Sequence, residues 1–334
     1  MNELIEPLVT MLLSLAFLLL TSHIAIKNTV RLSEITGLGK SRIGFTFVAT
    51  STSLPELAVA LFAAASGEAA VSIGNVLGSN IANVCLIIGL GLILYSLKPG
   101  LKKLAAIRFK PEELDLIYLG IFVASVIPIL LISFLPASQI VGLLLIAIYT
   151  YQNFKIISKR ELPLGETNTL NDQIANRRKT LMFHMILALL GIVGVIVSAD
   201  FLVDSTVRIA LLAGIPSSVI SATIIAIGTS FPELTLDIQA MLKEHVMLAF
   251  GDVIGSCFTN ITLILGVTLL FSPVRINIKV FSDLITFSTL ANMILWYLIH
   301  RGNLSSREGL YLLLLYALFL MSIMGILVFP GEFF

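Results

Sequence analysis

Charged residues are scarce in this sequence. Asp, Glu, Lys and Arg make up 12% of its 334 residues and hydrophobic residues make up 57%, whereas roughly 25% of a soluble domain is charged. This balance excludes an ordinary soluble globular protein and predicts an integral membrane protein, whose main partner is the lipid bilayer. The net charge of +1 gives no electrostatic reason to expect a nucleic acid as a partner.

Cysteine and histidine are also scarce. The two cysteines, Cys85 and Cys257, lie inside apolar runs, which argues against both a disulfide framework and a thiolate zinc site. The four histidines share no common spacing. Imidazole and thiolate are the usual ligands of transition metals, so we expect neither a resident cofactor nor a centre of that kind.

Apolar stretches of about 20 residues, the length that crosses a bilayer as a helix, recur along the whole chain. The sequence therefore predicts an all-α integral membrane protein with ten transmembrane helices. These spans lie near residues 5–26, 41–66, 69–97, 114–134, 136–155, 180–206, 217–242, 245–271, 279–299 and 308–328. The first has no cleavage-site pattern, so we expect it to be a retained helix rather than a signal peptide.

One long polar stretch, residues 156–179, separates the fifth span from the sixth. Basic residues orient the chain, because Lys and Arg gather in cytoplasmic loops. Of the 21 Lys and Arg residues, all but Arg208, Arg275 and Lys279 fall on the side of the membrane that holds this stretch. The distribution predicts a cytoplasmic linker at 156–179 and two extracellular termini, in a multi-pass protein of the plasma membrane.

Two short motifs interrupt the apolar runs with nearly the same residues. Thr52–Glu56 reads Thr-Ser-Leu-Pro-Glu, and Thr229–Glu233 reads Thr-Ser-Phe-Pro-Glu. The spacing between these motifs also aligns residues 29–89 with 206–266 without a gap, which indicates a duplication. Each motif places a carboxylate inside a membrane-length apolar segment, where such a charge is costly and usually marks the path of an ion or substrate.

The duplication is expected to be inverted. Each half carries five spans, an odd number, so the second half must enter the membrane from the opposite side. The sequence predicts two inverted-topology five-helix repeats at 1–155 and 180–334, with the repeated motif at 43–89 and 220–266. Inverted repeats with interrupted helices that meet near the midplane are the architecture of many secondary transporters.

Proline shapes the chemistry of the two motifs. Pro55 and Pro232 lack an N–H and disfavour helical geometry in the preceding residue, so backbone carbonyls just upstream should be freed or loosened. Free carbonyls beside carboxylates and hydroxyls form an oxygen-rich pocket, which suits a hard cation such as Ca²⁺. The side-chain donors are the carboxylates of Glu56 and Glu233, the hydroxyls of Thr52, Thr229, Ser53, Ser230, Ser79 and Ser256, and the amide oxygens of Asn83 and Asn260.

The serines and asparagines share a helical face. Asn83 follows Ser79 by four residues, as Asn260 follows Ser256, so each pair lies one turn apart on one face. The preceding glycines have the small-xxx-small spacing of closely packed helices, and packing alone is enough to explain them. A Ser and an amide repeated on one face favour a binding site.

Four blocks carry a resemblance to a known family. They are Ala49–Glu56 and Gly74–Asn83 in the first half, and Ala226–Glu233 and Gly251–Asn260 in the second. These blocks resemble the two alpha-repeats of the cation/calcium exchanger superfamily, and most closely those of its prokaryotic sodium/calcium exchangers. The resemblance implies a ten-helix antiporter, not an enzyme, with one central site for Ca²⁺ and three for Na⁺.

The resemblance also assigns roles by position. It implies that Glu56 and Glu233 are the calcium carboxylates, assisted by the carbonyls of Thr52 and Thr229. The implied sodium ligands are the carbonyls of Ala49 and Ala226 and the hydroxyls of Ser53, Ser79, Ser230 and Ser256, with Asn83 and Asn260 at the middle position.

The chain departs from the family pattern in its charge. Many prokaryotic members carry Asp where this chain has Asn260, so the site here holds two carboxylates, which one Ca²⁺ neutralises and three Na⁺ leave positive. Asp237 lies one turn beyond Glu233 on the same face, where the first half has Ala60. Asp237 is a candidate accessory site for a cation or a proton; the other interpretation is a solvated residue in the cytoplasmic mouth. Asp252 could guide cations at the cytoplasmic entrance or simply suit a helix start.

These observations predict an antiporter that exports Ca²⁺ by admitting Na⁺, in which the first and sixth helices move across a fixed core to alternate access. A Ca²⁺/H⁺ exchanger on the same fold is an alternative, because two glutamates bind two protons as readily as one Ca²⁺. An intramembrane protease and a calcium channel fit the paired Pro-Glu motifs and the inverted duplication less well. A monomer is compatible with this architecture.

Overall fold

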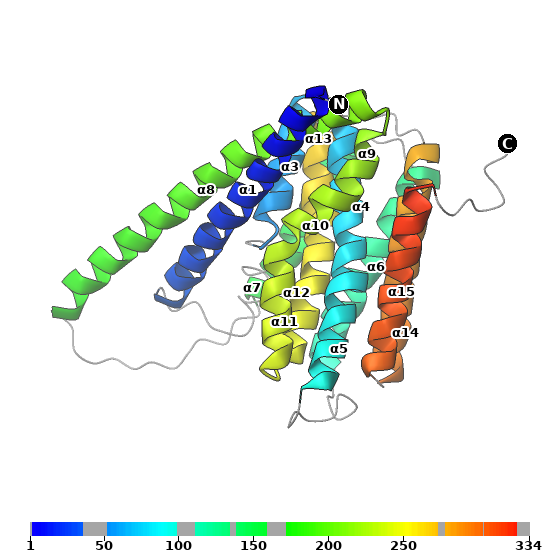
Figure 1. Ribbon diagram of the computed structural model, residues 1–334. Helices are drawn as coiled ribbons and strands as arrows, with labels where there is room; N and C mark the ends of the chain where they lie inside the picture. The colour runs from blue at the N-terminus through cyan, green and yellow to red at the C-terminus, as the bar shows by residue number, and fades with distance from the viewer. Residues whose placement is uncertain are drawn as a thin grey trace.

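Every regular element in the described part of the chain is a helix, and the helices pack side by side in one bundle (Figure 1). The structure is a computed structural model. It describes residues 2–35, 52–98, 111–133, 138–158, 172–272, 278–302 and 304–325.

The helices of the first half include one π-helical segment, in which hydrogen bonds reach one residue further than in an α-helix. They are α1 (Asn2–Ile35), α3 (Leu54–Ala65), α4 (Ala69–Ile81), the π-helical η2 (Ala82–Ile88), α5 (Gly89–Leu97), α6 (Pro111–Ser133) and α7 (Gln139–Ser158).

The helices of the second half include two such segments. They are α8 (Asp172–Ala213), α9 (Ser217–Ile220), the π-helical η4 (Ser221–Ile225), α10 (Ala226–Thr229), α11 (Phe231–Leu242), α12 (Val246–Thr259), the π-helical η5 (Asn260–Ile264), α13 (Leu265–Phe271), α14 (Ile278–Arg301) and α15 (Ser306–Ile323).

The helix bounds repeat along the chain. α3 and α11 begin and end at positions related by the offset of the sequence duplication, and α4 and α12 begin at positions related by the same offset. The last two helices of each half repeat at a shorter offset, which takes the start of α6 at Pro111 to that of α14 at Ile278. The same shorter offset takes the start of α7 at Gln139 to that of α15 at Ser306. The repetition thus extends over helices whose sequences no longer show it.

α4 and α12 cross in antiparallel fashion at the centre of the bundle (Figure 1). Asn80 and Cys257 are repeat mates, and they touch: the Asn80 side-chain amide donates to the Cys257 carbonyl at 3.5 Å, and the Cys257 thiol donates to the Asn80 carbonyl at 3.9 Å. A residue can contact its own mate only near the axis that relates the two halves. The crossing is therefore of the kind that an inverted repeat requires.

Two further helix crossings are matched and depend on glycine. A Cβ atom on Gly309 of α15 would lie 2.6 Å from the Gly89 carbonyl oxygen of α5, and one on Gly142 of α7 would lie 2.6 Å from that of Gly266 in α13. Real Cβ atoms do not come so close to backbone oxygen, so any larger residue would push these helices apart. Each crossing joins one half of the chain to the other.

In the described part of the chain, seven helices are long and apolar enough to cross a membrane, and an eighth span is the pair α9–α10 and α11, which bends by 46°. These eight correspond to eight of the ten predicted spans. Of the predicted span 41–66 the structure describes only the short apolar helix Leu54–Ala65, and 136–155 forms α7, which is not among the seven. The chain is a multi-span membrane protein, and the count of ten stays a prediction.

The long helices α1 and α8 pack against each other and lean against one side of the bundle (Figure 1). Leu18 of α1 and Leu202 of α8 belong to a buried apolar cluster that also contains Val59 of α3. No residue of α11 belongs to this cluster. Met241 of α11 belongs instead to the larger core, while Leu236 is exposed. The α1–α8 pair thus covers the α3 side of the molecule more than the α11 side.

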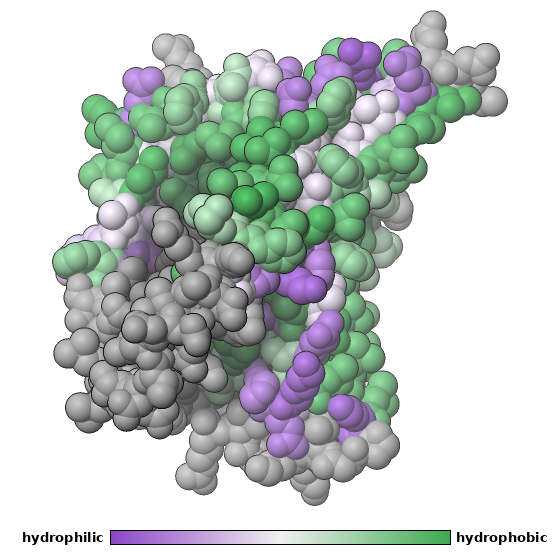
Figure 2. Space-filling model, turned by 90° about the vertical axis from the view of Figure 1, so that its left-hand side faces the viewer, coloured by the Kyte–Doolittle hydropathy of each residue, from purple (hydrophilic) through white to green (hydrophobic). Residues whose placement is uncertain are grey.

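The face that carries α1 and α8 is largely apolar (Figure 2). Large hydrophobic side chains are exposed on both helices, among them Leu12 and Phe17 of α1 and Phe183 and Leu190 of α8. A soluble monomer seldom exposes so extensive an apolar surface. The surface fits contact with lipid chains.

Candidate cation site

The two Pro-Glu motifs form helix starts in the middle of the bundle. Ser53 precedes α3 with φ −80° and ψ 10°, and Ser230 precedes α11 with φ −82° and ψ 8°. In each helix the proline lies in the first turn and the glutamate follows it. The predicted helix break at Pro232 is confirmed by the 46° bend, and both motifs have the same backbone form.

The bend at Pro232 disturbs fewer backbone hydrogen bonds than the sequence predicts. The Ala226 carbonyl still accepts a hydrogen bond from the Ser230 N–H at 3.1 Å and one from the Thr229 hydroxyl at 3.4 Å. The expectation that this carbonyl is loosened is therefore wrong, because a bend at one residue keeps the upstream hydrogen bond. Its first-half mate Ala49 lies outside the described residues.

π-helical segments hold the two middle asparagines. Asn83 lies in η2 and Asn260 begins η5, and the two segments lie at matching places in the halves. A π-turn is wider than an α-turn and is frequent at functional sites. The sequence alone did not indicate these segments.

The predicted site residues in the described ranges are all buried. None of them exposes more than 3% of its surface: they are Thr52, Ser53, Glu56, Ser79, Asn83, Ala226, Thr229, Ser230, Glu233, Ser256 and Asn260. Burying two ionised glutamate carboxylates costs a large amount of free energy unless a positive charge lies close to them. Within the described ranges, neither glutamate forms an ion pair with a Lys, Arg or His side chain.

Hydrogen bonds tie the two halves together at the site. The Ser230 hydroxyl donates to the Glu56 carboxylate at 3.3 Å, and the hydroxyls of Thr229 and Ser79 lie 3.5 Å apart. Glu56 and Glu233 are close enough to repel one another. The structure therefore brings residues from both motifs to one place, as the duplication predicts.

The middle amides lie at the crossing of α4 and α12. The Asn260 side-chain amide donates to the Asn80 side-chain oxygen at 2.9 Å, and the mate of Asn260, Asn83, faces the Cys257 thiol. Asn260 thus uses its N–H group within the protein. The side-chain oxygens of both middle amides, the better ligands for a hard cation, have no hydrogen-bond partner in the described part of the chain.

Unpartnered oxygen atoms concentrate at the predicted site. Buried polar atoms normally have hydrogen-bond partners, so each exception asks for an explanation. Among the described residues the exceptions include one oxygen of Glu56, both oxygens of Glu233, the hydroxyls of Ser53 and Ser256 and the amide oxygens of Asn83 and Asn260. All of these atoms can coordinate a cation.

Asp237 and Asp252 are buried as well. Asp237 is 1% exposed and Asp252 3%, and the two side chains are close enough to interact electrostatically. The interpretation of Asp237 as a solvated residue in an aqueous mouth does not fit this burial. For Asp252 the sequence indicates either a guide for cations at the cytoplasmic entrance or a residue that suits a helix start. It lies four residues before Ser256 and extends the face of Ser256 and Asn260 by one more turn.

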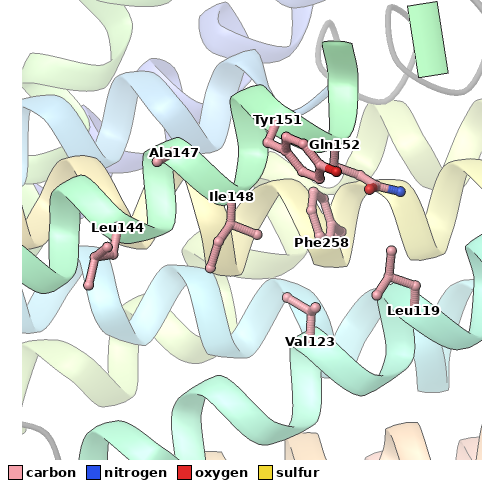
Figure 3. A pocket seen from close by; sticks show the side chains of 8 residues that line it. All are labelled: Leu119, Val123, Leu144, Ala147, Ile148, Tyr151, Gln152 and Phe258. Atoms are coloured by element: carbon pink, nitrogen blue, oxygen red, sulfur yellow. The ribbon is translucent and has the colours of Figure 1, made fainter. Parts of the chain in front are cut away.

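Other features of the described structure offer no second ion site of a familiar kind. No group of three or more His, Cys, Asp and Glu side chains in the described ranges is arranged to hold a metal ion. A cavity of about 400 Å³ between α6, α7 and α12 is lined mainly by apolar side chains such as Leu119, Ile148 and Phe258 (Figure 3). Such a lining suits hydrocarbon rather than a cation.

Comparison with known proteins agrees with this geometry. The family described as sodium/calcium exchanger protein matches residues 6–154 and 183–325, most of the chain. The sodium/calcium exchanger MaX1 of Methanosarcina acetivorans is 30% identical over 93% of this chain and 96% of its own length. The inner membrane protein YrbG of Escherichia coli is 29% identical over 81% of this chain and 82% of its own.

The fold has a counterpart of known structure. A solved structure of the sodium-calcium exchanger NCX_Mj superposes with a TM-score of 0.64 at 24% identity, over 94% of this chain and 98% of that one. At this identity the likeness establishes the fold only. From the family match and the relatives, the chain belongs to the sodium/calcium exchanger protein family, on the prokaryotic side of the cation/calcium exchanger superfamily, whose members exchange cations across membranes rather than catalyse a chemical reaction.

Proposed function

We propose that this protein exchanges Na⁺ for Ca²⁺ across the plasma membrane by alternating access and normally exports Ca²⁺. The observation that carries the proposal is the set of buried oxygen atoms without partners among the described residues, which comes from both Pro-Glu motifs and from the helices that cross between them. An empty cation site leaves its ligands in this condition. The relative MaX1, covered over nearly its whole length, is named a sodium/calcium exchanger, which supports the same two ions here.

The carboxylates set the preference for calcium. Glu56 and Glu233 together carry a charge of −2 when ionised, and one Ca²⁺ neutralises it. Calcium takes six to eight oxygen ligands at about 2.3 to 2.6 Å and accepts carboxylates, carbonyls and amides in flexible geometry. The buried donors around the two glutamates are of these types, and imidazole is not among the proposed ligands.

Sodium competes for overlapping ligands. We assign the carbonyls of Thr52 and Thr229 to the calcium position. The sodium positions use the carbonyls of Ala49 and Ala226 and the hydroxyls of Ser53, Ser79, Ser230 and Ser256, with Asn83 and Asn260 between them. Because each ion removes oxygens that the other needs, binding of Na⁺ favours release of Ca²⁺, and the reverse holds on the other side of the membrane.

Alternating access is supported by the position of α1 and α8. The pair shares its buried cluster with α3 and not with α11, so it closes one side of the site more than the other. In an inverted repeat, movement of the pair toward α11 gives the mirror arrangement. With both termini extracellular and a cytoplasmic linker, α3 lies toward the outside and α11 toward the cytoplasm, in a protein that needs only one chain for transport.

Calcium uptake into vesicles tests the proposal. Purified protein is reconstituted into proteoliposomes loaded with sodium, and identical vesicles are loaded with potassium or choline. We expect radioactive calcium to enter only the sodium-loaded vesicles, with or without a pH gradient. Uptake that follows an imposed proton gradient and ignores sodium would instead identify a Ca²⁺/H⁺ exchanger.

A further inference from the structure

The second half of the chain contains two buried aspartates that the first half lacks. Asp237 on α11 has Ala60 as its repeat mate on α3, and Asp252 on α12 has Asn75 on α4. The helices themselves correspond in the repeat, with α3 and α11 equal in length and start. The matching helices of the first half form without aspartate at these positions, so the backbone does not require the two aspartates.

The two aspartates face each other inside the protein. They are close enough to interact electrostatically, and they expose 1% and 3% of their surface. One oxygen of Asp237 and both oxygens of Asp252 are buried and have no partner among the described residues. In the described part of the chain no Lys, Arg or His forms an ion pair with either of them.

Two facing carboxylates offer only acceptors, so something must lie between them. Two ionised aspartates that lie close together repel each other, and burial makes the repulsion larger. A bound cation removes the repulsion and gives partners to the unpaired oxygens. A proton shared by the two groups removes only part of the charge and leaves the remaining oxygens without a partner.

We propose that Asp237 and Asp252 form a second binding station for a hard cation of the exchange reaction, Ca²⁺ or Na⁺, beside the central site. The inference rests on the proposed function, because it takes its ion from the exchange. The station lies beside the central site and not within it, because Asp237 is one helical turn beyond Glu233 on α11.

The station lies on a continuous row of ligands. Asp237 is one turn beyond Glu233 on α11, and Asp252 is one turn before Ser256 and two before Asn260 on α12. One helical turn is about 5.4 Å, so an ion moves a single step between the station and the central site. In the proposed orientation this step leads toward the cytoplasm, where calcium for export enters.

The station also bears on the charge of the exchange. Asn83 and Asn260 are both neutral, which leaves the central site with two carboxylates for its sodium ions. Asp237 and Asp252 bring two more carboxylates within one turn, so that a further Na⁺ is balanced nearby. The charge that is absent from the middle position is supplied from the second half alone.

Equilibrium binding to the purified protein tests the station. Radioactive calcium and radioactive sodium are titrated separately, at one fixed neutral pH, and the bound ions are counted per protein. We expect Asp252→Asn and Asp237→Ala each to lose one equivalent of Ca²⁺ or of Na⁺. These changes install the residues of the first half, which already fit the same backbone, so misfolding is not expected; the fluorescence of the single tryptophan, Trp296, checks the fold.

Two comparisons make the outcome decisive. Asp200→Asn removes an exposed carboxylate from α8 and should leave both ion counts unchanged. Unchanged counts in Asp252→Asn and Asp237→Ala as well would overturn the station and mean that the pair holds a proton. Glu233→Gln should remove calcium from the central site and leave binding at the station unchanged. If Glu56→Gln and Glu233→Gln both leave calcium binding intact, the proposed function fails, and the ion counts of Asp252→Asn and Asp237→Ala still decide whether the station exists.

Discussion

The two halves of the molecule share a backbone and differ in charge. The residues before α4 and α12, Glu68 and His245, have φ and ψ angles that agree within a few degrees, −94° and 49° against −92° and 47°. The side chains diverge at the positions that face the site, where neutral residues of the first half are replaced by Asp237 and Asp252. In the proposed exchanger the duplication supplies two equivalent ways into one site, and these two aspartates make them chemically unequal.

Substitution of the glutamate of either half should impair transport to a similar extent. Glu56→Gln and Glu233→Gln each remove one of two buried carboxylates, and we expect either change to reduce sodium-dependent calcium uptake by about 100-fold or more, equivalent to roughly 3 kcal/mol. Uptake into sodium-loaded proteoliposomes measures the loss, with Asp200→Asn as the control that keeps wild-type activity. A large effect at only one glutamate would show that the halves do not build a common site.

The crossing of α4 with η4 should be sensitive to a single methyl group. A Cβ atom on Gly78 would lie 2.3 Å from the Ala222 carbonyl oxygen, so Gly78→Ala must push two helices apart, at a cost of about 3 kcal/mol. We expect a clear fall in the thermal stability of the purified protein. Gly302 has φ 68° and nothing within 4 Å, so Gly302→Ala should lose only about 1 kcal/mol from its strained backbone. It serves as the control for a glycine change without crowding, and equal losses at both positions would contradict the close approach.

The repeat is visible in the sequence at positions that have a specific chemical role. It is not visible there in helices for which only the packing repeats. The Pro-Glu motifs, the serines and the asparagines align at one offset because each has a specific role in the backbone or at the site. α6, α7, α14 and α15 repeat too, but at a shorter offset, and many apolar residues can fill a lipid-facing helix. Their relation is visible in the helix bounds and not in the residues.

Two features of the site could not be predicted for a different reason. A π-turn differs from an α-turn by one hydrogen-bond step, and the residues of η2 and η5 are ordinary helix residues with no mark of it. The sequence leaves two roles open for Asp252, a guide for cations at the cytoplasmic entrance or a residue that suits a helix start, and its position in the middle of α12 does not fit a helix start. Its burial follows from how α11 packs on α12, which the sequence of one helix does not reveal.

The serines of the two motifs should respond unequally in the ion-free protein. The Ser230 hydroxyl donates to Glu56 at 3.3 Å, whereas the hydroxyl of its mate Ser53 has no partner among the described residues. We expect Ser230→Ala to lower the free energy of unfolding by about 1 to 2 kcal/mol, the value of a hydrogen bond to a charged group, and Ser53→Ala to change it little. Thermal unfolding in sodium-free buffer with a calcium chelator measures both; similar losses would remove this difference between the halves.

The smallest expected difference concerns the turns that lead into α4 and α12. Gly67 has φ 77° with open space around it, and its repeat mate Glu244 has φ 64°. An L-residue in this region costs roughly 1 to 2 kcal/mol, which glycine avoids. Gly67→Ala should therefore lower the free energy of unfolding by about 1 kcal/mol, and Glu244→Gly should raise it by less, because glycine also gains freedom in the unfolded chain. Thermal unfolding of the two variants checks the opposite signs; a loss of stability in both would mean that Glu244 makes an interaction that outweighs its strained backbone.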